Sequence, residues 1–174
     1  MEQAGVNYLL DDKVIFSRKK TGNKWFETQD QISYWKDFNK CKIIYPEITK
    51  FINFVFDENQ SFLVNNKCFI LTGYHIEYLT AFFNSSIFKY CFINNFPELQ
   101  GGTRELRKIF FELIPVKLID DKINLAFSMI VKEIQEKKKQ NIDTTLLEKK
   151  CDEMLFDIYD LTSEERETIG FIKI

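Results

Sequence analysis

The stretch that decides the fold is Phe38–Ile48, which has the sequence FNKCKIIYPEI. Its run Lys42–Tyr45 predicts a β-strand, and the strand should end at Pro46 because proline cannot donate a hydrogen bond to a central ladder. Further along the chain, Asn65–Gly73 has the sequence NNKCFILTG, in which Cys68–Leu71 is a second continuous apolar run. The two runs together predict a small sheet in the first half of the chain.

Weaker strand signals surround these two runs. Phe51–Phe56 and Phe62–Val64 are predicted as short strands, because the DENQ sequence of residues 57–60 between them is typical of a turn. Residues 1–40 are expected to be irregular, with one strand at Lys13–Phe16. A further apolar run, Ile109–Val116, predicts a strand that ends around Pro115.

Helical spacing begins after Gly73. Apolar residues recur every three or four positions over residues 76–91, and Asn84-Ser85-Ser86 in the middle indicates a helix stop followed by a new N-cap. From Asp120 onward, apolar stripes predict helix throughout, apart from a turn at Asn141–Thr144. Thr162 or Ser163 is expected to cap a last short helix whose first turn is acidic, as the helix dipole favours.

These patterns predict an α+β fold. Residues 1–118 should form a small β-rich body with two packed helices, and residues 119–174 a C-terminal antiparallel helical hairpin. A chain of 174 residues that is 45% hydrophobic can bury one good core, and most of its 18 phenylalanines should lie in it.

Charge and cysteine content narrow the function classes. The net charge is -2, but cations concentrate near residues 18–24 and 104–108 while the tail is acidic, so binding of DNA on one face is compatible with the composition. The four cysteines have neither metal-ligand nor redox spacing, and there is one histidine, His75. Charges interrupt every apolar run well short of the ~20 residues of a membrane span. We therefore expect a soluble, cytoplasmic chain.

The sequence lacks clear catalytic motifs. No glycine-rich cofactor loop and no Asn/Asp-Pro-Pro turn of an amino-methyltransferase is present. Carboxylate–lysine triplets of the kind found in metal-dependent nucleases do occur, but three of the four lie on predicted helical surface. They are Asp11-Asp12-Lys13, Asp120-Asp121-Lys122, Glu136-Lys137-Lys138 and Glu148-Lys149-Lys150. We assign no catalytic, cofactor-binding or metal-ligating residue.

The two strand segments and the tail Leu155–Ile169 (LFDIYDLTSEERETI) together resemble a known family. They are similar to the TaqI-like C-terminal specificity domain of type IIG restriction–modification enzymes and adenine-specific DNA methyltransferases. The resemblance extends from about Trp25 to Ile172, and its most specific parts are Leu79–Ser85 and Tyr159–Thr162. Cys41 departs from the pattern, since the family often has proline there.

The resemblance implies a function. Domains of this family recognise a sequence in double-stranded DNA and deliver it to a methyltransferase, and often to a nuclease. This chain would then carry recognition without catalysis, and its partner would be a methyltransferase or endonuclease domain or subunit. In the family, helices placed like the C-terminal hairpin pack against catalytic or connector regions and set the distance between recognition and catalysis.

Two basic segments are candidates for contact with DNA. The first, residues 18–24, has cations on both sides of a glycine. It could bind DNA phosphates, and the alternative is a solvated turn. In the second, two glycines let the backbone approach a ligand, and glutamine and arginine can bond adenine and guanine bidentately, although a mobile connector is the alternative. The candidate DNA-binding residues are Arg18, Lys19, Lys20, Lys24, Gln100, Gly101, Gly102, Thr103, Arg104, Arg107 and Lys108.

Three further interpretations remain open. Glu47, in the strand-end motif Tyr45–Ile48, could accept from a cytosine amine, but its apolar neighbours favour a structural role. His75 is expected to lie in a helix-cap region or to face DNA. For the whole chain, the alternatives to DNA recognition are a protein-interaction scaffold without a DNA role and a metal-dependent nuclease.

Overall fold

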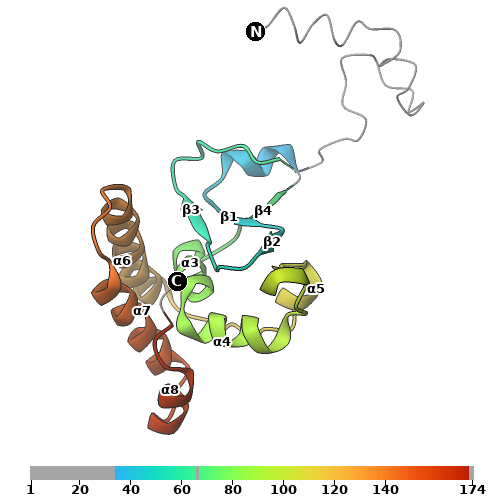
Figure 1. The fold of residues 1–174 in the computed structure, drawn as a ribbon. Helices are drawn as coiled ribbons and strands as arrows, with labels where there is room; N and C mark the ends of the chain where they lie inside the picture. Colours follow the sequence, from blue (N-terminus) through green and yellow to red (C-terminus); the bar gives the residue numbers. More distant parts are fainter. Residues whose placement is uncertain (1–33, 66, 173–174) are drawn as a thin grey trace, which may run out of the picture. The chain divides into compact units, whose positions relative to one another are not determined.

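The computed structural model describes residues 34–65 and 67–172 (Figure 1). The described residues from Asp37 onward form one compact unit. The strand expected at Lys13–Phe16, the triplet Asp11-Asp12-Lys13 and the first basic segment lie outside the described residues.

Among the described residues, four short strands come after a 3-10 turn and before two helices. A second 3-10 turn and a fifth short strand come next, and the remaining helices end this part of the chain. The strands are β1 (Lys42–Pro46), β2 (Ile48–Thr49), β3 (Val55–Asp57), β4 (Cys68–Leu71) and β5 (Arg104–Glu105). The helices are α3 (Ile76–Asn84), α4 (Ser86–Asn95), α5 (Lys108–Phe111), α6 (Asp121–Lys139), α7 (Thr145–Ile158) and α8 (Ser163–Ile169), with 3-10 turns η1 (Trp35–Asn39) and η2 (Gln100–Gly102). The predicted α+β class is confirmed.

The main sheet has three antiparallel strands in the order β3-β1-β4. The central strand β1 pairs Ile43 with Phe56 on one side and with Leu71 on the other. Pro46 is its last residue, opposite Cys68. The strands predicted at Lys42–Tyr45 and Cys68–Leu71 are therefore confirmed, and both belong to one sheet.

The strand predictions between them were only partly right. Phe51–Phe56 keeps a strand-like alternation of buried and exposed residues, but the ladder begins at Val55. Phe62–Val64 is not a strand. The Asp57 carboxylate accepts hydrogen bonds from the backbone N–H groups of Ser61 and Phe62, both at 3.1 Å, and so folds the chain into a turn.

The strand predicted at Ile109–Val116 is wrong, since α5 lies in this region. The backbone N–H of Phe110 bonds to the Arg107 carbonyl at 3.0 Å. Phe110 packs on Phe96 and Phe111 packs on several buried rings, including Phe88. A strand would send two consecutive side chains to opposite faces, so a helical turn is needed to direct both toward the core.

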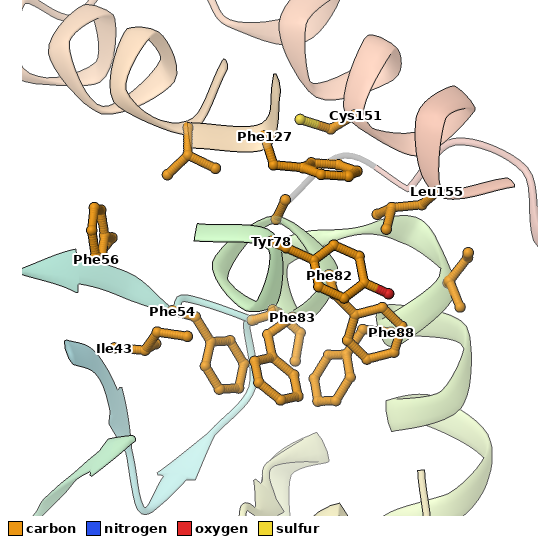
Figure 2. Close-up of a cluster of buried hydrophobic side chains, with 14 of the residues drawn as sticks. Ile43, Phe54, Phe56, Tyr78, Phe82, Phe83, Phe88, Phe127, Cys151 and Leu155 are labelled. Carbon is orange, nitrogen blue, oxygen red and sulfur yellow. The ribbon is translucent and has the colours of Figure 1, made fainter. Parts of the chain in front are cut away.

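The core is built of aromatic rings around α3 (Figure 2). Phe83 stacks on Phe54 from the sheet side at 5.0 Å between ring centroids, and meets Phe88 of α4 edge-on at 5.1 Å. On the other side of α3, Tyr78 contacts Phe127 of α6. As expected, most of the described phenylalanines are buried or pack against this core, because a ring removes a large apolar area from water.

Three of the described helices begin at a side-chain N-cap, and two of these caps, Ser85 and Thr162, lie where capping signals predicted them. Ser85 caps α4 by accepting from Phe88 N, and Asp120 caps α6 by accepting from Ile123 N at 2.8 Å. Thr162 caps α8 in a reciprocal pair with Glu165. Helices α6 and α7 pack against each other as a hairpin, α6 also lies on α3, and α7 on α4. The boundary at residue 118 stays a prediction.

Within the residues that the structure describes, none of the helices is both long and apolar enough to cross a membrane.

Candidate nucleic-acid interface

The second basic segment forms a tight turn that leads into β5. Gly101 and Gly102 have φ angles of 77° and 76°, in the left-handed region that other residues avoid. A Cβ at Gly101 would meet no atom within 4 Å, so it is the backbone conformation, not lack of space, that favours glycine. Leu99 N donates to Thr103 O at 2.7 Å, and Thr103 Oγ1 donates to Gln100 O at 3.0 Å. The turn is therefore held by its own backbone and presents Gln100 and Gly101 to solvent.

Arg104 lies largely inside the protein. Its Nη1 donates to the Phe96 carbonyl at 2.6 Å, and its Nη2 to Glu98 Oε2 at 3.1 Å. The guanidinium also lies 5.8 Å from the centroid of the Phe92 ring, and the side chain is 13% exposed. These contacts tie the turn to the end of α4. Arg104 as a base-reading residue stays a prediction, and the structure adds a positioning role for it.

Arg107 and Lys108 are the exposed cations of this segment. Arg107 Nε lies 2.7 Å from Glu105 Oε1, and Lys108 Nζ lies 3.3 Å from Glu112 Oε1. Their side chains are 60% and 85% exposed. Exposed ion pairs contribute only about 0–1 kcal/mol, so phosphate oxygens can replace these carboxylates at little cost.

Lys50 lies beside this turn because two segments far apart in the sequence pair with each other. Strand β2 pairs antiparallel with β5, with Thr49 opposite Arg104, so the chain leaves β2 where β5 begins. Lys50 Cε lies 3.7 Å from the position of a Cβ on Gly102. The sequence alone does not point to Lys50, because about 50 residues separate it from the turn and no local pattern joins the two.

Backbone contacts support the structural interpretation of Glu47. Its N–H donates to the Lys67 carbonyl at 2.9 Å, and its carbonyl accepts from Leu106 N at 2.8 Å. Glu47 therefore links the loop before β4 to the end of β5. Its carboxylate lies 3.9 Å from Lys67 Nζ.

His75 occupies a helix-cap position, one of the two places expected for it. It is the residue before α3, in the left-handed region with a φ of 51°, and its Nε2 lies 2.9 Å from Asp121 Oδ1.

The three described carboxylate–lysine triplets lie at the start of α6, at its end and in α7. Glu136 lies near Lys139, and Glu148 near Lys138. Residues 34–65 and 67–172 contain no group of three or more His, Cys, Asp or Glu side chains arranged to hold a metal ion.

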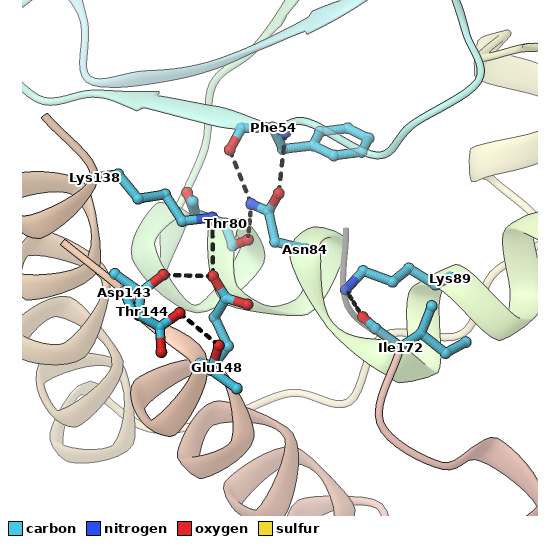
Figure 3. Close-up of polar contacts among 10 residues, drawn as sticks. Phe54, Thr80, Asn84, Lys89, Lys138, Asp143, Thr144, Glu148 and Ile172 are labelled. Atoms are coloured by element: carbon cyan, nitrogen blue, oxygen red, sulfur yellow. Dashed lines mark hydrogen bonds and ion pairs between the residues drawn. The ribbon is translucent and has the colours of Figure 1, made fainter. Parts of the chain in front are cut away.

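A cleft of about 690 Å³ lies between β3, α3, α6 and α7. Its lining carries several charges, and most of them are already paired, as Figure 3 shows for Lys138 and Glu148. Lys132 meets Glu58, Lys138 meets Glu148 at 2.9 Å, and Lys139 meets Glu136 at 3.5 Å. Because carboxylates line the cleft alongside the lysines, its lining has no excess of positive charge that would attract a phosphate.

A polar network lies where Lys89 and Asp152 line this cleft. Asp152 accepts from both the N–H and the hydroxyl of Ser86, whose Oγ accepts from Ile172 N at 3.0 Å. Lys89 donates to the Ile172 carbonyl. Burial raises the pKa of Asp152, which the Ser86 bonds oppose, and burial lowers the pKa of Lys89. The network fastens the C-terminal segment to α4 and α7.

Comparison with known families gives one match. The model of a family described as the TaqI-like C-terminal specificity domain matches residues 8–116. No curated protein matches the chain. The matched stretch contains all of β1–β5 and the segment Gln100–Lys108.

Proposed function

Because the chain belongs to the TaqI-like C-terminal specificity domain family, which recognises DNA sequence in restriction–modification enzymes, we propose the following role for it. It binds a specific sequence in double-stranded DNA and holds that DNA for a methyltransferase or endonuclease in another domain or subunit, as in type IIG enzymes. The observation that carries the proposal is the glycine turn of the matched stretch, with exposed cations on both sides of it.

Cations around the turn supply the phosphate grip. Lys50, Arg107 and Lys108 are exposed. Lys50 follows β2, which pairs with β5, Arg107 lies between β5 and α5, and Lys108 is the first residue of α5. Contacts to phosphate fix the register of a protein on the duplex, while contacts to base edges carry specificity. Arg18, Lys19, Lys20 and Lys24 are proposed to extend the phosphate grip.

Gln100 and Arg104 are the proposed base-reading side chains, with Gly101, Gly102 and Thr103 shaping the turn. Glutamine suits adenine and arginine suits guanine in the major groove. Gln100 is exposed, whereas Arg104 must leave its partners Phe96 O and Glu98 to reach a base. The two residues thus differ in how readily they can contact DNA.

The helical hairpin of residues 119–174 is proposed as the spacer toward the catalytic partner. Its tail is acidic and would repel phosphate, which places it away from DNA. Leu125 and Met129 are one helical turn apart on α6 and are both exposed. Such a pair on one helix face suits contact with another protein domain.

The same exposed pair favours the second candidate function, a protein-interaction scaffold without a DNA role. Salt dependence separates the two candidates. For DNA binding, log K should fall with log[salt] by roughly 0.9 per phosphate neutralised. Anisotropy of a labelled random-sequence duplex from about 50 to 200 mM salt measures this slope. Absence of duplex binding at low salt, or a slope near zero, would favour the scaffold.

A matched pair of variants tests where the DNA lies. Arg107→Gln with Lys108→Gln should reduce the slope by about 1.8, because two phosphate contacts are lost. Lys122→Gln with Lys150→Gln removes two exposed cations from the hairpin and should leave the slope unchanged. Equal effects of the two pairs would contradict the proposed interface.

The proposal also assigns no chemistry to this chain. Incubated with DNA, magnesium and S-adenosylmethionine, the purified chain should neither cleave nor methylate. Activity that persists through stringent purification and is lost on mutation of the chain would contradict this assignment.

A further inference from the structure

Phe51 is a large apolar side chain that the fold holds in solvent. It is 64% exposed, although Ile52, the next residue along the chain, is buried in the core. Residues 51–56 alternate, with Ile52, Phe54 and Phe56 buried. Because successive side chains of an extended segment point to opposite faces, burying that set directs Phe51 outward.

The backbone around Phe51 is fixed by Thr49. Thr49 Oγ1 accepts from Phe51 N at 3.1 Å and donates to the Phe51 carbonyl. These bonds fold Thr49–Phe51 into a closed turn at the end of β2. The ring of Phe51 is thus presented on an ordered turn, which lowers the entropy cost of using it for binding.

This turn lies at the same end of the β2–β5 pair as the glycine turn. Thr49 is opposite Arg104, and Lys50 reaches Gly102. Lys50 and Phe51 therefore join a cation and an aromatic ring beside the proposed base-reading segment. The Lys50 ammonium suits a DNA phosphate. The Phe51 ring suits the 5-methyl group of thymine, which is the apolar feature of the base edges in the major groove.

We infer that the Thr49–Phe51 turn is a second DNA-contacting element, in which Lys50 holds a phosphate and Phe51 contacts the methyl group of a thymine in the recognised sequence. This inference rests on the proposed DNA-recognition function and adds one specificity-determining residue, Phe51, to it. Phe51 contributes to sequence preference, while Lys50 contributes affinity for all sequences.

The first experiment selects duplexes from a random-sequence library with the full chain and with Phe51→Ala. The wild-type chain should enrich a defined sequence that contains thymine, and Phe51→Ala should lose preference at that thymine alone. Phe62→Ala, which removes another exposed phenylalanine, should enrich the wild-type sequence. Enrichment of the same sequence with the same preferences by Phe51→Ala would overturn the inference.

The second experiment replaces the selected thymine by uracil, which removes only the methyl group. Affinity of the wild-type chain should fall about fourfold, as for one buried methyl, and affinity of Phe51→Ala should not change. Equal losses for both proteins would show that Phe51 does not contact the methyl group.

Lys50→Gln has a separate readout. It should reduce the salt slope by about 0.9 and leave the selected sequence unchanged. An unaltered slope overturns the role of Lys50. If the wild-type chain binds no duplex at low salt, the proposed function itself fails and the inference fails with it. If the wild type selects a sequence and the Phe51 and Lys50 variants behave like it, only the inference fails.

Discussion

The side-chain amide of Asn84 on α3 makes two hydrogen bonds to the backbone of Phe54, as a neighbouring β-strand would. Asn84 Oδ1 accepts from Phe54 N at 3.1 Å, and Asn84 Nδ2 donates to Phe54 O at 2.8 Å (Figure 3). Gln135 on α6 makes one such bond to the backbone of Phe56, whose N–H donates to Gln135 Oε1 at 3.0 Å. Since β3 is an edge strand, these amides satisfy groups that could otherwise pair with another chain.

Asn84→Ala should destabilise the fold by about 2–4 kcal/mol. The change removes both bonds to Phe54 and the bond from Nδ2 to the Thr80 carbonyl, and leaves partly buried backbone groups unpaired. Urea unfolding followed by circular dichroism measures the loss. Asn94→Ala is the control, since Asn94 makes one exposed bond to Tyr90 O, and should cost no more than about 0.5 kcal/mol. Equal losses would show that Asn84 does not secure the edge.

Lys42→Met should destabilise the protein by about 3–5 kcal/mol, because it leaves the buried carboxylate of Asp57 without its ion pair. Lys42 Nζ lies 2.5 Å from Asp57 Oδ2, and both side chains are buried. Lys40→Met breaks an exposed pair with Asp37 at a similar distance, and should cost no more than about 1 kcal/mol. The same unfolding measurement compares the two, and a small loss for Lys42→Met would mean that the pair is dispensable.

The Asp57 carboxyl should make the free energy of unfolding depend on pH in the acid range. Burial tends to raise its pKa, but hydrogen bonds from Lys42, Phe62 N and Ser61 N hold the pKa below its ordinary value of 3.8. A lowered native pKa means that its stabilisation is present above pH 3.8 and is lost as the pH falls through the native pKa. The difference in unfolding free energy between wild type and Asp57→Asn should therefore narrow mainly as the pH falls from about 4 to about 2. A difference that is constant over this range would contradict the shift.

Cys151 should be the most protected thiol among the described cysteines. It is buried in the hairpin, and burial together with the nearby Asp152 and Glu148 raises its pKa to about 12. Since the thiolate is the reactive form, modification of the native chain by a thiol reagent at about pH 8 should spare Cys151 longest. Peptide mapping by mass spectrometry after timed quenching identifies the modified residues. Early modification of Cys151 in folded protein would contradict its burial.

Arg104→Ala should reduce affinity for the selected duplex by about 1–3 kcal/mol, with the loss concentrated at one base pair, if its guanidinium bonds guanine. Arg107→Ala and Lys108→Ala should weaken all sequences alike, as expected for phosphate contacts. Binding of single-position variants of the duplex, measured in the reconstituted enzyme where possible, separates these patterns. An Arg104→Ala variant that folds normally and keeps both affinity and preference would show that Arg104 only positions the turn.

Local patterns in the sequence were sufficient where one short-range effect dominates. Lys42–Tyr45 and Cys68–Leu71 are strands because continuous apolar runs of that length suit a buried sheet. Helix α4 begins after Ser85 because a serine hydroxyl satisfies a free N–H at that position. The glycine turn was also identified from residue types alone, since consecutive glycines mark a backbone that other residues cannot adopt.

Local patterns failed where distant contacts decide. Ile109–Val116 has the composition of a strand, but Phe110 and Phe111 both find rings to pack on, which only a helical turn allows. Phe62–Val64 has no partner strand, because Asp57 turns the chain and helices close the edge of β3.

For the candidate interface, the sequence by itself determined a glycine turn flanked by cations and a family that recognises DNA. Only the tertiary structure decided that Arg104 is held by Phe96 O and Glu98, and that Lys50 and Phe51 lie at the same turn. The physical reason is that antiparallel pairing of β2 with β5 joins segments far apart in the chain. Such pairing depends on contacts between distant segments, such as the hydrogen bond from Leu106 N to Glu47 O, which no local spacing encodes.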